Sequence, residues 1–176
     1  MNAMSMDRTD SRAARRYLAL AHGTIDAADP RLRGVPGVSF EPGGVLKIAT
    51  RLARHPTDRQ RQAVSFDRGR HAVTRARMLE RFGTPPSAML VECRLETGRT
   101  HQVRVHMAHL GHPLIGDPVY GRDRKGFKSI LETLDFKRQA LHAKRLGFIH
   151  PVTEEPLAFD SLLPADMQEL LSELHV

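Results

Sequence analysis

The chain has 176 residues, which is enough for one domain with a hydrophobic core, and it has no apolar run long enough to span a bilayer. Residues 31–150 hold 23 Lys and Arg against 10 Asp and Glu, whereas residues 151–176 hold six acids and no Lys or Arg, and a basic body of this kind favours a polyanionic partner over a merely solvated surface. The single cysteine excludes an intrachain disulfide, and together with the lack of an apolar signal sequence it predicts a cytoplasmic protein with no membrane partner.

Strand and turn signals dominate the first half of the chain. Short runs that alternate apolar and polar residues indicate strands, and clusters of Gly, Pro and Asp separate them. The elements expected there are a strand over 15–21, a loop with turns over 26–44, a strand over 45–52, an Arg-rich connection over 54–70, a segment over 71–82 that fits neither period cleanly, and a strand over 89–95. Cys93 alternates with Val91 and Leu95 in the last strand, so we expect it in the core and not as a nucleophile.

The segment over residues 99–107 carries the most information. Read as a strand, it places Val103 and Val105 on one face and Gln102 and Arg104 on the opposite face. A core strand that also carries a row of hydrogen-bond donors is typical of a cleft wall. A guanidinium in mid-strand, as at Arg104, needs an anion, which is a carboxylate or a phosphate, and a purely structural ion pair is the plainer alternative.

The second half of the chain mixes loops, strands and helices. We expect a Gly- and Pro-rich loop over 111–121, a helix over 127–138 and a strand over 141–149. A C-terminal helix begins near Pro164, and its apolar stripe consists of Met167, Leu170, Leu171 and Leu174. Because strands and helices do not alternate regularly, the sequence predicts one α+β domain with a mostly antiparallel mixed sheet and flanking helices.

Four histidines lie close together in the sequence: His101, His106, His109 and His112. On a strand, His101 and His106 would face opposite ways, there is no His-Glu-x-x-His motif, and one cysteine cannot build a structural zinc site. We therefore expect no metal, and we expect these histidines to orient their neighbours through hydrogen bonds. A metal-dependent hydrolase is the least favoured functional alternative.

Aromatic residues are sparse on this basic chain, which has two tyrosines and no tryptophan. Tyr17 is either half-buried core or a platform on which a base stacks. The scarcity of aromatic platforms argues against a sequence-tolerant single-strand binder.

Several motifs follow one another along the chain. The longest is Leu-Glu-Thr-Gly-Arg-Thr-His-Gln-Val-Arg-Val-His at 95–106, followed by Gly-His-Pro-Leu-Ile-Gly-Asp-Pro-Val-Tyr-Gly at 111–121. Shorter motifs are Arg-Arg-Tyr-Leu-Ala-Leu-Ala-His-Gly at 15–23, Arg-His-Pro-Thr-Asp-Arg at 54–59, Gln-Ala-Leu-His-Ala at 139–143 and Phe-Ile-His-Pro at 148–151. This collinear set resembles the RluA-type pseudouridine synthases, and it is most similar to the branch that modifies large-subunit ribosomal RNA.

The resemblance implies the fold of that family and an RNA isomerase that needs neither cofactor nor metal. In the family, an aspartate nucleophile acts on a uridine that is flipped out of its stack; the bond from uracil N1 to the ribose breaks, and the base turns and rejoins through C5. By the resemblance, Arg104 pairs with that aspartate and Tyr17 contacts the flipped base. The expected RNA-binding residues are Arg54, Arg59, Arg61, Arg99, His101 and Gln102.

The family's aspartate belongs to an Arg-Leu-Asp-x-x-Thr-Ser-Gly motif well upstream of its tyrosine motif. Here Asp7 lies only ten positions before Tyr17, and Arg12 stands where the motif has glycine, so Asp7 is a weak candidate for the nucleophile. We expect residues 1–14 to be disordered or unrelated to the family, and residues 15–176 to be a partial catalytic domain with impaired activity or none. The alternative is a non-catalytic RNA-binding remnant or pseudoenzyme.

Overall fold

The computed structural model describes residues 14–175, so Asp7 and nearly all of the expected N-terminal segment 1–14 lie outside the described residues. The described part of the chain forms eight strands and four helices. In chain order these are β1 (Arg15–His22), α1 (Pro30–Arg33), β2 (Val38–Glu41), β3 (Val45–Arg54), β4 (Gln62–Ser65), β5 (Arg70–Phe82), β6 (Ala88–Leu95), α2 (Gln102–His109), α3 (Lys125–Thr133), β7 (Leu141–Ile149), β8 (Pro156–Asp160) and α4 (Ala165–Leu174).

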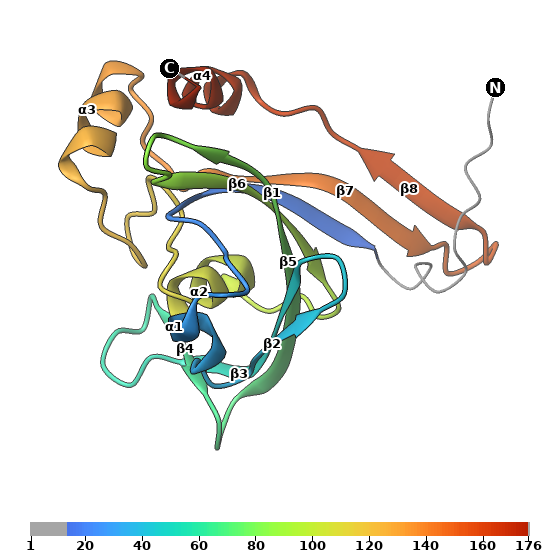
Figure 1. Cartoon of the computed structure of the whole chain (residues 1–176). Helices are drawn as coiled ribbons and strands as arrows, with labels where there is room; N and C mark the ends of the chain where they lie inside the picture. Colours follow the sequence, from blue (N-terminus) through green and yellow to red (C-terminus); the bar gives the residue numbers. More distant parts are fainter. Residues whose placement is uncertain (1–13, 176) are drawn as a thin grey trace.

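The strands form one curved sheet in the order β2-β3-β5-β6-β1-β7-β8, with β4 paired to β3 (Figure 1). Inside the sheet, β1 places Tyr17 opposite Cys93 of β6 and opposite Ala143 of β7. The expected α+β fold with an antiparallel sheet and flanking helices is confirmed. Each strand pairing within the described residues is antiparallel, so the sheet is more uniform than expected.

The alternation of side chains along β1 divides the core between the two faces of the sheet. Ala19 and Ala21 turn to the face that α2 covers, where they belong to one cluster with Val103 and Met107. Leu20 turns to the other face and belongs to a second cluster with residues of α3 and α4. Figure 1 shows α2 inside the curve of the sheet, and α4 on the opposite side of β6.

The prediction of a strand over 99–107 is wrong, because most of this segment forms helix α2. Alternation at Val103 and Val105 fits a strand, but Val103, Met107 and Leu110 also recur at helical spacing, and all three join the cluster under the sheet. The polar side chains between them are buried as well. A helix that is buried on nearly every side shows no clean apolar stripe, so its short alternation was mistaken for the period of a strand.

The other expected elements are present with altered bounds. The strands expected over 15–21, 45–52, 89–95 and 141–149 are β1, β3, β6 and β7, and the ambiguous segment over 71–82 is strand β5. The helix expected over 127–138 is α3, which ends at Thr133, close to Asp135 with its left-handed backbone (φ 52°). The C-terminal helix is α4, with Pro164 as its N-cap.

Four short elements, α1, β2, β4 and β8, were not expected. The three strands among them have four or five residues each, and each pairs with a longer neighbour, β2 and β4 with β3 and β8 with β7. Strands this short show little periodicity because pairing in the folded sheet, and not local pattern, makes them strands. No helix within residues 14–175 has the length and apolar content needed to cross a membrane.

Candidate functional site

Arg104, in the first turns of α2, is held by a buried carboxylate. Its Nε and Nη2 donate hydrogen bonds to Oδ2 and Oδ1 of Asp117 at 2.8 and 2.9 Å. Arg104 is 7% exposed and Asp117 is 3% exposed. A bidentate pair of this kind fixes both the plane and the direction of the guanidinium. The third nitrogen, Nη1, makes no hydrogen bond within residues 14–175, so Arg104 keeps donors for one further anion.

Asp117 is itself fixed by the loop that carries it. Its Oδ1 also accepts the backbone N–H groups of Val119 and Tyr120 at 2.9 and 3.0 Å, as Asp commonly does in turns. Burial raises the pKa of Asp117, but the hydrogen bonds from Arg104 and from these two N–H groups outweigh burial and hold that pKa below its usual value. Within the described residues, the carboxylate that Arg104 contacts is therefore a charged group with a fully buried side chain, and it positions the guanidinium. This is the structural ion pair that the sequence offered as the plainer alternative.

Three of the expected site residues lie around the side chain of Tyr120. The guanidinium carbons of Arg104 and Arg61 lie 5.0 and 5.5 Å from its centroid, within cation–π distance. The Tyr120 hydroxyl accepts the backbone N–H of Gln62 at 2.8 Å, which leaves its proton for Nδ1 of His101 at 2.8 Å. We call Arg61, His101, Arg104, Asp117 and Tyr120 the Tyr120 cluster.

His101 lies directly before α2 and has left-handed backbone, with φ of 55°. This conformation is uncommon for a residue other than glycine and concentrates at sites where the surroundings hold it in place. Burial, followed by the positive charge of Arg104, lowers the pKa of His101, and Asp117 opposes this shift. The imidazole is therefore neutral at pH 7, which suits it to accept the proton of the Tyr120 hydroxyl.

Gln102 does not present itself to a ligand in this fold, because it is 2% exposed. Its amide nitrogen donates to the backbone oxygen of Val73 and to the hydroxyl of Thr74, both at 3.0 Å. Its amide oxygen accepts from the Thr97 hydroxyl at 2.8 Å and from the backbone N–H of Arg99 at 3.0 Å. Because these bonds use the amide inside the fold, Gln102 anchors the start of α2 to β5, and we do not retain it as an RNA contact.

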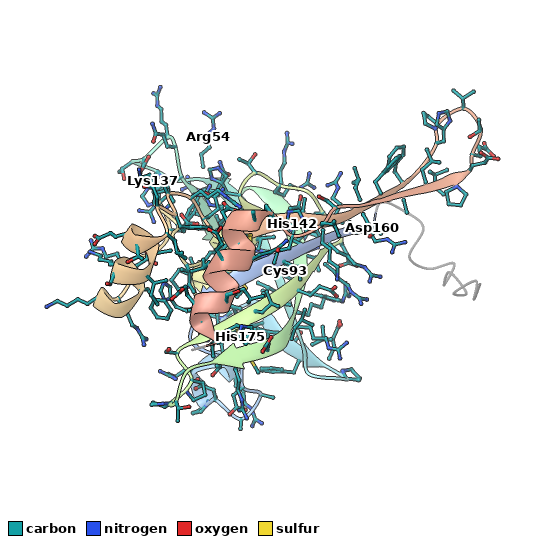
Figure 2. The ribbon with its side chains drawn as sticks, turned by 90° about the horizontal axis from the view of Figure 1, so that it is seen from above. Arg54, Cys93, Lys137, His142, Asp160 and His175 are labelled. Carbon is teal, nitrogen blue, oxygen red and sulfur yellow. The ribbon has the colours of Figure 1, made fainter. Side chains whose placement is uncertain are left out.

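The expected arginines differ in how close they come to the Tyr120 cluster. Arg54 ends β3 and is exposed, and Figure 2 shows its side chain directed away from the body of the protein. Arg59 is exposed in the connection from β3 to β4, whereas Arg61 is half-buried and reaches the ring of Tyr120. Arg99 donates from Nε to a backbone oxygen at the start of β5. Arg61 therefore belongs to the cluster, and Arg54 and Arg59 lie on the exposed surface beyond it.

Tyr17 lies on β1 and on the sheet face that α2 covers. It is half-buried and packs against the same hydrophobic cluster as Val103, the neighbour of Arg104 on α2. The two expected catalytic residues therefore belong to the same side of the sheet, although they form no hydrogen bond or ring contact with each other within residues 14–175. A cavity of about 800 Å³ lies at the C-terminal end of α2, and neither Tyr17 nor Arg104 lines it.

The histidines are dispersed in the fold. His106 is fully buried and its two ring nitrogens bond to the hydroxyls of Thr50 and Thr74 at 2.9 and 2.8 Å. Burial, followed by the nearby His109, lowers the pKa of His106 to about 3, so the ring is neutral. His109 and His112 bond to backbone oxygens elsewhere. Within residues 14–175, no three or more His, Cys, Asp or Glu side chains come close enough together to hold a metal ion.

Two members of the Tyr120 cluster, Asp117 and Tyr120, were not among the expected site residues. Both lie in the Gly- and Pro-rich loop over 111–121, which was expected as a loop without an assigned role. The available signal was an aspartate inside a tight loop, where its carboxylate can bond to backbone N–H groups two and three residues later. The pairing of Asp117 with Arg104 could not be read from the sequence, because thirteen positions separate the two residues.

The chain is similar in sequence and in fold to known proteins. A family model described as RNA pseudouridylate synthase matches residues 2–109. Ribosomal large subunit pseudouridine synthase D of Zymomonas mobilis is 54% identical over 127 residues, which are 71% of this chain and 39% of that protein. An uncharacterized RNA pseudouridine synthase of Bacillus subtilis is 45% identical over 160 residues, which are 91% of this chain and 44% of that protein. The chain thus spans about two fifths of the length of these relatives.

A solved human structure, RNA Pseudouridylate Synthase Domain Containing 1, has the same fold. It superposes with a TM-score of 0.63 at 23% identity, and the match covers 94% of this chain and 67% of that one. The family model covers more than half of the chain. This chain therefore belongs to the RNA pseudouridylate synthase family.

Proposed function

We propose that the protein isomerises uridine to pseudouridine in large-subunit ribosomal RNA, and that Arg104 orients the nucleophilic carboxylate. The observation that supports this role is the Arg104–Asp117 pair, because it locks the guanidinium by two hydrogen bonds and leaves Nη1 to bind a second anion. Family membership supplies the reaction, and the names of the relatives supply the class of RNA.

In this proposal the Tyr120 cluster is preorganised before RNA binds. Asp117 and Tyr120 already hold the Arg104 guanidinium, so little reorganisation is needed when a carboxylate and a nucleotide arrive. A fixed positive charge beside the nucleophile favours its charged form. Tyr17 contacts the flipped uracil, and Arg54, Arg59 and Arg61 bind RNA phosphates.

The reaction needs no redox partner, because it exchanges one bond to the ribose for another. The bond from uracil N1 to the ribose breaks, the base turns, and C5 forms the new bond while the proton on C5 is lost and N1 gains one. We place the protein in the cytoplasm, where ribosomal RNA is found and where a free thiol such as that of Cys93 stays reduced.

The direct test is to incubate the chain with large-subunit ribosomal RNA and to map pseudouridine. We expect at most weak product with the native chain, in line with the expected impairment. Arg104→Lys should lower that product at least about tenfold, because an ammonium cannot form the bidentate bond to Asp117 and hold a second anion in plane. Circular dichroism checks that the variant is folded. Asp7→Ala tests the weak candidate nucleophile, since unchanged product formation by Asp7→Ala would exclude it.

The second candidate function is a non-catalytic RNA-binding protein. It is favoured by one observation: within the described residues, the carboxylate at Arg104 is the buried Asp117 and not an accessible nucleophile. This candidate predicts salt-dependent RNA binding without pseudouridine formation. The same incubation therefore separates the two functions.

A further inference from the structure

A line of basic residues crosses the sheet on the face opposite to α2. Strand register places Lys47 of β3 opposite Arg75 of β5, and Arg75 opposite Arg94 of β6. Arg94 lies opposite Arg16 of β1, which lies opposite Arg145 of β7. Five cations thus occupy one transverse row over five neighbouring strands, and we call them the cation row. At the usual strand spacing the row is about 19 Å long.

The row faces away from the Tyr120 cluster. The residues that flank its members along the strands, such as Leu46, Ile48, Ala76 and Cys93, are buried in the core on the α2 side. Because side chains alternate along a strand, the row itself points to the opposite side of the sheet. The helices α3 and α4 cover that side around Leu20. The buried cluster to which they belong includes no member of the cation row.

Like charges directly opposite each other on a sheet destabilise it, so four such contacts in one row call for an explanation. Acids offset part of the repulsion: Arg75 pairs with Glu41 at 2.8 Å and with Glu96 at 3.1 Å. Arg94 pairs with Glu92 at 3.2 Å, and Arg145 lies 3.7 Å from Asp160, which Figure 2 labels on β8. Four acids therefore lie among the five cations of the row.

A cavity beside the row adds a second observation. It measures about 220 Å³ and is lined by Glu41, Val45, Arg75, Arg77, Glu92 and Arg94. Arg77 is exposed, and within residues 14–175 neither Arg77 nor Lys47 forms an ion pair with a carboxylate. Lys47 lies near Glu41 and Arg77 lies opposite Glu92, but neither cation is held by a short ion pair in the described part of the chain. Both therefore keep side-chain N–H donors for an incoming anion.

We propose that the cation row and its cavity form a second RNA-binding surface, which holds backbone phosphates on the side of the sheet remote from the Tyr120 cluster. A row of closely spaced cations across neighbouring strands suits the closely repeated negative charges of a nucleic-acid backbone. The surface reads charge and not sequence, because guanidinium and ammonium groups here meet phosphates and no base edge. This inference rests on the proposed function only in taking RNA as the partner.

The test compares two double variants that remove the same charge. Lys47→Gln with Arg77→Gln changes the row and cavity without leaving a carboxylate unpaired. Lys125→Gln with Lys128→Gln changes two exposed lysines of α3 and serves as the matched control. Binding of a short fluorescein-labelled RNA hairpin is measured by anisotropy over a series of KCl concentrations, and binding of labelled polyglutamate is measured in parallel.

We expect the row variant to weaken RNA binding by about tenfold or more at low salt, and to reduce the slope of log K against log salt by about 1.4 to 1.8, the value for two lost phosphate contacts. The α3 variant should leave that slope unchanged. Equal slopes for the two variants would overturn the inference, and so would a loss confined to polyglutamate, which would indicate an acidic protein partner.

Pseudouridine mapping on the same samples keeps this inference separate from the proposed function. If the slopes differ as expected but no pseudouridine forms with the native chain, the second RNA surface is supported and catalysis is refuted. If pseudouridine forms while the two variants bind RNA alike, catalysis is supported and the second RNA surface is refuted.

Discussion

Replacing Asp117 by Asn tests whether the buried pair with Arg104 holds the site together. The substitution keeps the shape of the side chain but removes its charge. Asp117 accepts four hydrogen bonds, two from the Arg104 guanidinium and two from backbone N–H groups, and an amide has only one acceptor oxygen to offer them. The Arg104 charge would then be buried without a counter-charge.

Removing one partner of a buried ion pair typically costs about 3 to 5 kcal/mol. Both side chains here are at most 9% exposed, so we expect a loss in that range. For a chain of this length, 1 kcal/mol corresponds to about 2 to 4 °C in melting temperature, so the midpoint should fall by roughly 6 to 20 °C. Because the pKa of Asp117 is lowered in the fold, its charge stabilises the protein at neutral pH, and the difference between the two proteins should shrink only as pH falls through about 4 and below.

Urea unfolding followed by circular dichroism at pH 7 measures the free energy of unfolding of the native chain and of Asp117→Asn. A double-mutant cycle uses Arg104→Met, Asp117→Leu and the two substitutions together. The double variant should be more stable than either of these single variants, because no buried charge is left unpaired. A loss below about 0.5 kcal/mol for Asp117→Asn, within the range of ordinary surface substitutions, would refute the reasoning.

Three further outcomes are expected. The depressed pKa of His106, about 3, means that the unfolded chain gains a proton first as pH falls below about 6.5. This group should therefore lower the free energy of unfolding by at most about 1.4 kcal/mol per pH unit towards pH 3, and a slope unchanged in His106→Gln would contradict this. Gly116→Ala should melt well below Gly111→Ala, because both glycines have positive φ but only a Cβ at 116 would clash with the carbonyl oxygen of Arg138; equal midpoints would show that the clash is relieved. Burial raises the pKa of Cys93 to about 12, so iodoacetamide at pH 8 should label it only in urea, and rapid labelling of the native protein would place the thiol outside the core.

Much of the architecture was predictable from local pattern. The brief alternation over residues 15–21 indicated the strand that is β1, and the position of Cys93 between Val91 and Leu95 indicated a core strand. These predictions succeeded because each strand shows in its own sequence either a brief alternation or a short apolar run bounded by turn signals. The collinear motifs likewise indicated the family.

The site depended on tertiary structure to a much greater extent. Local pattern indicated that Arg104 needs an anion, because a guanidinium in a packed element is rarely buried without one. Only the folded structure shows that α2 is a helix, that the anion beside Arg104 within the described residues is Asp117, and that the Gln102 side chain points into the core. The physical reason is that a helix buried on nearly every side takes its hydrogen-bond partners from segments distant in sequence, and neither periodicity nor propensity records which segments those are.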